Sequence, residues 1–237
     1  MNPDPSNPRT REPASLLPLL QLCDSLFPIG SFGYSDGLET AAHQGATSID
    51  DLRAWLDVCL DETFARLEGP AVMRAWEASV VADWPALASI DGELIALRPS
   101  SSARRSSRAM GLRLVTTWQA IHASPRLAQL LQLVTAGSLA PTLPVAFAGA
   151  CAASGIARRE AIQSYAYTRL AATVSAAMRL MPIGQTDAHR ILTGTLSRVP
   201  SLVSAIERST APLECFCPLM DIAAMTQQYL DSRLFRS

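Results

Sequence analysis

The clearest structural pattern of the chain lies at residues 48–67, SIDDLRAWLDVCLDETFARL. Ser48 is a favoured N-cap residue, and Asp50 and Asp51 follow in the first turn, where the helix dipole stabilises acids. Apolar residues then recur at steps of three and four, which is the period of one helix face. That face consists of Leu52, Trp55, Leu56, Cys59, Leu60, Phe64 and Leu67. The stretch therefore predicts an amphipathic helix.

Proline marks the boundaries of further helices on either side of this stretch. Gly69-Pro70 is expected to end the first helix and to begin the next, because proline suits the first helical turn. The same reasoning places helix starts or stops at Pro85, Ser100–Ser102, Pro125, Pro144, Arg158 and Pro182–Gly184. No stretch alternates apolar and polar residues as a strand would. We therefore predict an all-α bundle of roughly ten helices with short connections.

The domain organisation follows from composition. Residues 1–14 hold four of the sixteen prolines and predict a disordered N-terminal arm. Residues 15–237 show no internal repeat and no linker, and apolar residues make up 49% of the chain. This predicts one all-α domain with a sizeable core.

The basic residues exclude two kinds of chemistry. All twenty are Arg, and the chain contains no Lys. A Walker-type phosphate loop and Schiff-base catalysis both require a Lys side chain. The formal net charge of −1 argues against nucleic-acid binding.

The charges are nevertheless separated along the chain. Residues 35–93 hold twelve acids against three Arg, a net charge of −9, whereas residues 98–126 hold six Arg and no acid. Such blocks predict either that one packs against the other or that they face charged partners.

Membrane association and secretion are not expected. Residues 127–157 carry no charge and are long enough to span a bilayer, but Gln and Pro residues interrupt them, so a helix buried on all sides is expected. The N-terminus is polar and proline-rich, without the apolar segment of a secretory signal. The five cysteines are odd in number and scattered, which predicts free thiols and a cytoplasmic location.

Few residues point to metal or catalytic chemistry. Cys215-Phe216-Cys217 is the only close pair of soft ligands, and a structural metal site needs about four. The three His residues lack metal-binding spacing, and no nucleophile motif is present. A metal-dependent enzyme could use the acids of residues 50–62, which are Asp50, Asp51, Asp57, Asp61 and Glu62. Three of them, however, lie opposite the leucine stripe and should face solvent.

A glycine-rich loop is the remaining signal. Gly30, Gly33 and Gly37 fall within eight residues of a chain that has twelve glycines in all. This spacing permits positive φ and a close backbone approach. It fits either a tight turn between helices or a surface that another protein or an anion contacts.

Five segments resemble one family in the same order along the chain. Residues 22–39, LCDSLFPIGSFGYSDGLE, resemble the N-terminal signature of the urease accessory family UreF. Residues 177–187, AMRLMPIGQTD, resemble a second specific motif of that family. Softer matches are SRAMG at 107–111, PVAF at 144–147 and SRLFRS at 232–237.

The resemblance implies an all-α homodimer in a cytoplasmic complex with UreD (also called UreH) and the GTPase UreG. That complex delivers nickel to apo-urease. The chain would be an adaptor without a cofactor of its own rather than an enzyme, and modulation of the GTPase is one role left open. A helix rich in small residues at 166–177 also favours a homodimer. The implied partner-binding residues are Pro28, Gly30, Phe32, Ser35, Gly37, Glu39, Arg179, Gln185, Arg233, Leu234, Phe235 and Arg236.

The C-terminal tail departs from the family pattern. Gln227-Gln228 stands where many members have His-Glu, and His189 stands where many have Gln. Leu234 and Phe235 have little local sequence to bury them, so the tail is expected either to fray or to dock in a groove on a partner. An upstream stripe should continue into that groove, formed by Phe216, Leu219, Met220, Ala223 and Leu230, with Gln227 on the same face.

Overall fold

The computed structural model describes residues 16–235, apart from the side chain of Phe32. This part of the chain contains α-helices, two short 3-10 helices (η1 and η3) and one π-helix (η2), and no β-strand, so the all-α prediction is confirmed. The expected arm at residues 1–14 lies outside the described residues. The helices in chain order are α1 (Leu16–Cys23), η1 (Ser31–Gly33), α2 (Leu38–His43), α3 (Ile49–Val58), η2 (Cys59–Glu68), α4 (Gly69–Val81), α5 (Trp84–Ala96), α6 (Ser101–Ile121), α7 (Pro125–Thr135), α8 (Leu143–Ala153), α9 (Arg158–Leu180), α10 (Gln185–Leu196), α11 (Val199–Ile206), α12 (Pro218–Thr226) and η3 (Gln227–Tyr229).

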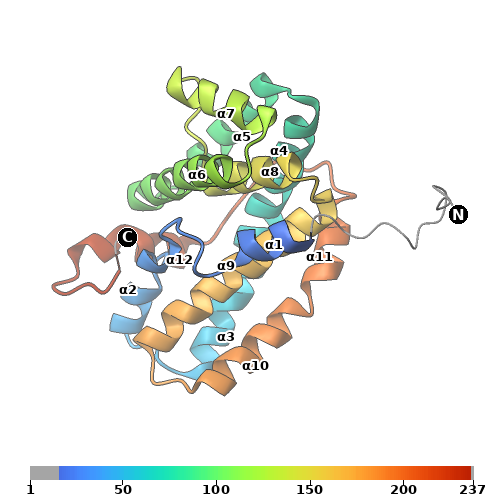
Figure 1. Cartoon of the computed structure of the whole chain (residues 1–237). Helices are drawn as coiled ribbons and strands as arrows, with labels where there is room; N and C mark the ends of the chain where they lie inside the picture. The colour runs from blue at the N-terminus through green and yellow to red at the C-terminus, as the bar shows by residue number, and fades with distance from the viewer. Residues whose placement is uncertain (1–15, 236–237) are drawn as a thin grey trace, which may run out of the picture.

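One long helical segment connects the two halves of the molecule. Figure 1 shows α3 in the lower half, near α9 and α10, and α4 in the upper half, near α8. Ser48 begins this segment as predicted, since its Oγ accepts the Asp51 N–H at 3.1 Å. The buried leucines Leu52, Leu56 and Leu60 lie on its inner face.

The prediction at Gly69-Pro70 is confirmed in one part and wrong in the other: α4 begins at Gly69 with Pro70 in its first turn, but the chain does not leave the helical conformation there. Glu68 and Gly69 keep right-handed helical dihedrals, and the Gly69 N–H donates to the Phe64 carbonyl five residues back. Pro70 has no N–H, which would leave the Arg66 carbonyl, four residues back, without a donor. The Glu214 N–H donates to that carbonyl at 3.3 Å. A distant loop therefore lets the helix continue through the proline.

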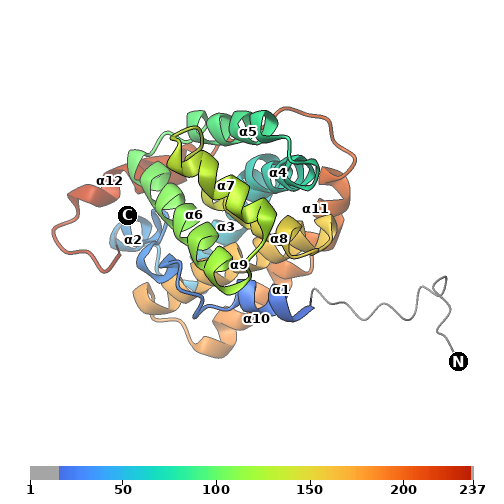
Figure 2. The same cartoon turned by 45° about the horizontal axis from the view of Figure 1, so that its top comes forward.

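Helix α8 lies at the centre of the upper half. Its residues from Leu143 to Ala152 are all buried, so the prediction of a fully buried helix in the charge-free stretch 127–157 holds here. It is wrong for residues 127–142, which form most of the partly exposed α7 and a connecting loop. Helix α8 packs most extensively against α4 and α6 (Figures 1 and 2). Thr142 and Leu143 donate their backbone N–H groups to Asp91 and Ser107, which satisfies the buried helix start. Within residues 16–235, no helix is long and apolar enough to cross a membrane.

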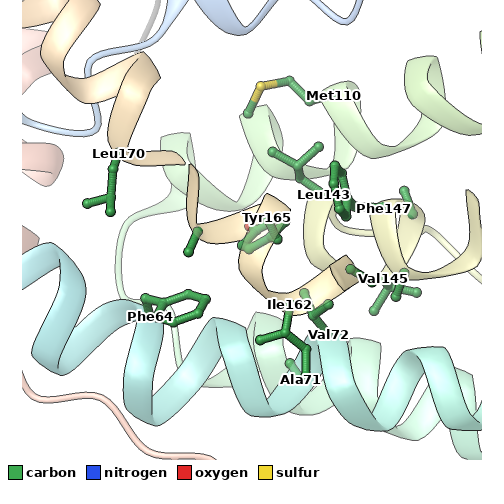
Figure 3. Close-up of a cluster of buried hydrophobic side chains, with 14 of the residues drawn as sticks. Phe64, Ala71, Val72, Met110, Leu143, Val145, Phe147, Ile162, Tyr165 and Leu170 are labelled. Atoms are coloured by element: carbon green, nitrogen blue, oxygen red, sulfur yellow. The ribbon is translucent and has the colours of Figure 1, made fainter. Parts of the chain in front are cut away.

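The main core forms where α4, α8 and α9 meet. Figure 3 shows Phe64, Val72, Phe147, Ile162 and Tyr165 directed toward one another from these helices and η2. The Phe147 and Tyr165 rings pack edge to face with centroids 5.4 Å apart. This core fixes α9, whose far end carries part of the candidate site.

Candidate partner-binding site

The glycine-rich loop lies between α1 and α2 and is in direct contact with α12. Gly37 has φ +93°, in the left-handed region that favours glycine. A Cβ at Gly37 would lie 2.7 Å from the backbone nitrogen of Ala224 in α12. The sequence therefore needs glycine here both for backbone conformation and because a second helix rests on the loop.

Gln227 connects this loop to the end of α12. Its side-chain oxygen accepts hydrogen bonds from the Ser35 hydroxyl at 3.1 Å and from the Gly37 N–H at 3.2 Å. Its side-chain nitrogen donates to Glu39 Oε2 at 2.7 Å. Gln227 is fully buried, so this amide is an internal connector rather than a surface group.

Glu39 binds the C-terminal tail. The backbone N–H groups of Leu234 and Phe235 donate to its two carboxylate oxygens, the second at 3.3 Å. Only 1% of Glu39 is exposed. We call the set Ser35, Gly37, Glu39, Gln227, Leu234 and Phe235 the tail clasp.

The tail clasp buries Phe235 within the chain itself. The guanidinium of Arg179, at the end of α9, lies 4.4 Å from the centre of the Phe235 ring, and Phe235 is 3% exposed. The expectation that the tail frays or needs a groove on a partner is therefore wrong for Phe235, because α9 and Glu39, both remote in sequence, supply its contacts. Leu234 remains 55% exposed.

Ion pairs connect the glycine-rich loop to α9 and to the end of η2. Asp36 pairs with Arg169 of α9, and Arg169 Nε lies 3.4 Å from Glu68 Oε2. Glu68 also pairs with Arg98. Burial alone would raise the pKa of Asp36, but Arg169, aided by Arg98, outweighs this effect and holds that pKa below its ordinary value.

Exposed apolar residues lie along α12 and directly before and after it, beside the tail clasp. We define the α12 outer stripe as Phe216, Leu219, Ile222, Met225 and Tyr229, all of which are exposed. Figure 1 shows α12 next to α2, at the edge of the molecule. Isolated apolar residues are normal on a surface, whereas neighbouring exposed apolar residues are typical of interaction surfaces.

The α12 outer stripe corrects the stripe predicted from the sequence. Phe216 and Leu219 face solvent, whereas Ala223 and Gln227 face the glycine-rich loop, so these residues do not share one face. The sequence analysis missed Ile222, Met225 and Tyr229. The three-residue spacing from Leu219 through Ile222 to Met225 was the signal that could have found two of them.

A groove of about 550 Å³ adjoins the tail clasp. It lies between α1, the glycine-rich loop and α9 and includes residues Tyr34, Ala172, Ser175, Arg179 and Phe235 in its lining. The small residues predicted on α9 therefore form part of a recess, with α1 packed against the same helix.

The remaining predicted residues are not part of the tail clasp. Pro28 and Gly30 are exposed at the start of the loop, and Arg233 is exposed on the tail. Gln185 is the exposed first residue of α10 and makes no hydrogen bond to the loop or tail among the described residues. The Phe32 side chain and Arg236 lie outside the described part of the structure.

The acids considered for a metal-dependent enzyme serve structural roles instead. Asp51 completes the cap with Ser48, Asp50 pairs with Arg53, and Glu62 pairs with Arg66. Asp57 and Asp61 both bind Arg198. Within residues 16–235, no group of three His, Cys, Asp or Glu side chains could hold a metal ion. The geometry therefore does not support that alternative.

Comparison with known proteins places the chain in a family. A family model described as UreF matches residues 46–195. The urease accessory protein UreF of Methylobacillus flagellatus is 32% identical over 228 residues, which cover 94% of this chain and 98% of the relative. The UreF of Delftia acidovorans is 34% identical over 235 residues, covering 94% and 97%. This chain belongs to the UreF family.

Membership of the UreF family makes the chain a urease accessory protein, which supports urease maturation. The UreF family consists of accessory proteins and is not known as a family of enzymes. The matched model region, residues 46–195, includes most of the core but neither the glycine-rich loop nor α12. The tail clasp thus lies where the family model does not reach, although the relatives align over nearly the whole chain.

Proposed function

We propose that this UreF-family chain is a cytoplasmic, non-catalytic adaptor that binds UreD (UreH) and UreG during the delivery of nickel to apo-urease. The observation that supports this role best is the α12 outer stripe beside the tail clasp. Leu234 is exposed as well, and its backbone N–H binds Glu39 of α2, the helix that packs against α12.

The energetics of the α12 outer stripe favour a protein partner. Burying one large apolar side chain contributes about 1.5–3 kcal/mol. The tail clasp already fixes α12 against the glycine-rich loop, so little conformational entropy is lost when a partner covers the stripe. A preorganised apolar face of this kind suits a stable protein–protein contact.

Co-purification with UreD tests the proposed surface. Leu219→Asp places a charge in the centre of the α12 outer stripe, where the native side chain is 81% exposed. Val81→Asp is a matched control, because Val81 at the end of α4 is an apolar residue that is 73% exposed. We expect Leu219→Asp to abolish co-purification with UreD and to reduce urease maturation, while Val81→Asp retains both.

We further propose a homodimer formed through α1. Leu16, Leu17 and Leu20 are exposed on this helix, which borders the 550 Å³ groove on α9. Leu17→Asp should convert a dimer to a monomer in sedimentation experiments without loss of helicity. Sedimentation of the native protein as a monomer at micromolar concentration would contradict the proposal.

A further inference from the structure

Two thiols lie close together in the loop that leads into α12. Cys215 Sγ and Cys217 Sγ are 3.4 Å apart, which is a hydrogen-bond distance for sulfur. Cys215 is partly exposed and Cys217 is buried. All five cysteines of the chain are free thiols. The pair is therefore reduced in this structure, and a small reagent can reach it through Cys215.

The hydrogen bond makes the two thiols chemically different. A thiolate on Cys215 accepts the Cys217 S–H, and this contact lowers the pKa of Cys215 below its ordinary value. Arg98 acts in the same direction, whereas burial, Asp221 and Glu68 oppose it. The same hydrogen bond, together with burial, raises the pKa of Cys217. Since the thiolate is the reactive form, Cys215 is the nucleophile of the pair and Cys217 keeps its proton.

Cys59 shows how the same surroundings act on a single thiol. Cys59 is partly exposed and borders a cavity of about 80 Å³ that Cys215 and Cys217 also line. Burial raises the pKa of Cys59 to about 12, and it raises the pKa of Cys23, in the other groove, to about 11. Reaction with an oxidant should therefore be concentrated at the Cys215–Cys217 pair.

We propose that Cys215 and Cys217 form an oxidation site, which hydrogen peroxide converts to a disulfide and which thereby alters the α12 outer stripe. In the first step the Cys215 thiolate attacks one peroxide oxygen. The O–O bond breaks, an S–O bond forms, and hydroxide leaves. In the second step the Cys217 sulfur attacks the sulfur of this sulfenic acid. The S–O bond breaks, an S–S bond forms, and the Cys217 proton leaves with the hydroxide as water. The pair loses two electrons to the peroxide, and exchange with a dithiol reductant restores it.

Closing the disulfide changes the start of α12. The two sulfurs must approach from 3.4 Å to about 2.05 Å. Upstream the loop is fixed, because Glu214 pairs with Arg66 at 2.9 Å. The movement therefore falls on Phe216, which lies between the two cysteines and is 80% exposed, and on Cys217. The Cys217 carbonyl accepts the Asp221 N–H in the first turn of α12, and Phe216 is the first residue of the α12 outer stripe. Oxidation thus acts directly on that surface.

Mass spectrometry of the reduced full-length protein after treatment with hydrogen peroxide tests the oxidation site. Trypsin releases residues 209–233 as one peptide, which contains Cys215 and Cys217 and no other cysteine. With labelling under denaturing conditions, this peptide should take up two maleimides before treatment, none after it, and two again after dithiothreitol. Cys23 and Cys59 should stay labelled throughout. Persistent double labelling of residues 209–233, or equal loss of label at Cys59, would overturn the proposal.

Serine variants separate the roles of the two thiols. Cys217→Ser should leave a sulfenic acid on Cys215 that dimedone traps, because no second thiol displaces the hydroxide. Cys215→Ser should trap far less, and the control Cys59→Ser should form the disulfide as the native protein does. Circular dichroism verifies that each variant keeps its helicity. Trapping chiefly on Cys217, or chains linked to one another on a non-reducing gel, would contradict an internal reaction started by Cys215.

The effect of oxidation on the α12 outer stripe has a readout that needs no partner. Chymotrypsin cleaves after exposed aromatic residues, and Phe216 lies inside the ring that the disulfide closes. Oxidation should therefore slow cleavage after Phe216 in the native protein and leave it unchanged in the Cys215→Ser/Cys217→Ser double variant. Equal cleavage of the reduced and the oxidised native protein would show that the disulfide leaves the surface unaltered.

The consequence for partner binding rests on the proposed function and is measured separately. The oxidised native protein should co-purify with UreD less than the reduced protein does, and dithiothreitol should restore binding. The double variant should bind equally with and without peroxide. Unchanged binding by protein whose disulfide is verified would overturn the consequence. If the reduced protein itself failed to bind UreD, the proposed function would fail, while the labelling and cleavage results would still decide the oxidation site.

Discussion

The substitution Glu39→Gln tests whether the Glu39 carboxylate binds the C-terminal tail. In Glu39→Gln, one carboxylate oxygen becomes an amide NH₂ that faces donors instead of accepting from them. At least one buried N–H then loses its partner, which costs about 1–3 kcal/mol. We expect a matching drop in the free energy of unfolding in urea, together with faster proteolysis near Leu234.

The control for this change is Glu93→Gln on α5. The Glu93 carboxylate makes no hydrogen bond or ion pair within the described residues, so its replacement should have little effect. If both substitutions lower stability equally, Glu39 does not hold the tail.

Gly37 tests the contact between the glycine-rich loop and α12. Gly37→Ala and Gly45→Ala both place alanine at positive φ, which costs about 1–2 kcal/mol. At Gly45 no atom lies within 4 Å of the new Cβ, whereas at Gly37 the Cβ meets the α12 backbone. Thermal unfolding should therefore show a larger loss for Gly37→Ala, and equal losses would contradict direct packing of α12.

The sequence predicted some residues of the tail clasp and missed the contacts that join them. The glycine spacing and the resemblance pointed to Ser35, Gly37 and Glu39 as candidates. Neither revealed that Gln227 is their shared partner, because hydrogen bonds between residues about 190 positions apart leave no local pattern. Phe235 was assigned to a partner groove for the same reason, since its contacts come from α9 and Glu39.

Gly69 tests the packing of the long helical segment against α11. A Cβ at Gly69 would lie 2.7 Å from Ile206 Cδ1 and 2.9 Å from the Phe64 carbonyl oxygen. Gly69→Ala should lower the free energy of unfolding by about 1–3 kcal/mol through overpacking. Gly194→Ala in α10, which meets nothing within 4 Å, should instead raise it by about 0.5–1 kcal/mol. Urea unfolding of both variants checks this expectation. If Gly69→Ala stabilised the protein as Gly194→Ala does, Gly69 would not be closely packed against Ile206.

The sequence predicted where helices begin more accurately than where one helix continues into the next. Ser48 and Ser100 cap α3 and α6 as predicted, because a cap depends on residues within one turn. The continuation through Pro70 depends on the distant Glu214 N–H, which no local pattern reveals.

The partly buried ion pair of Asp36 with Arg169 predicts a pH dependence for the chain as a whole. Because the pKa of Asp36 is lowered in the folded protein, the unfolded chain binds more protons in mild acid. The stability that Asp36 contributes is complete above the ordinary pKa of about 3.9 and is lost as pH falls toward the folded value. We expect Asp36→Asn to reduce the slope of unfolding free energy against pH below about 4. An unchanged slope would show that the pair with Arg169 is not linked to folding.

The charge blocks of the sequence predicted only part of the ion pairing in the folded chain. Arg98 of the basic block pairs with Glu68 of the acidic block, so the two blocks do meet. Arg105, Arg108 and Arg113 instead lie exposed on α6 without an ion pair among the described residues. Sequence predicted the helical class from period and proline spacing, but which charges pair depends on how distant helices cross.

The tail clasp also has a consequence for the order in which the chain folds. Its hydrogen bonds join residues separated by 188 to 196 positions, so they close a loop almost as long as the described chain. Closing so long a loop is entropically costly until the intervening helices have formed. The clasp is therefore a late event that acts on the unfolding rate rather than the folding rate. The surface beside α12 is completed only after the core has been assembled, so a half-folded chain cannot present it.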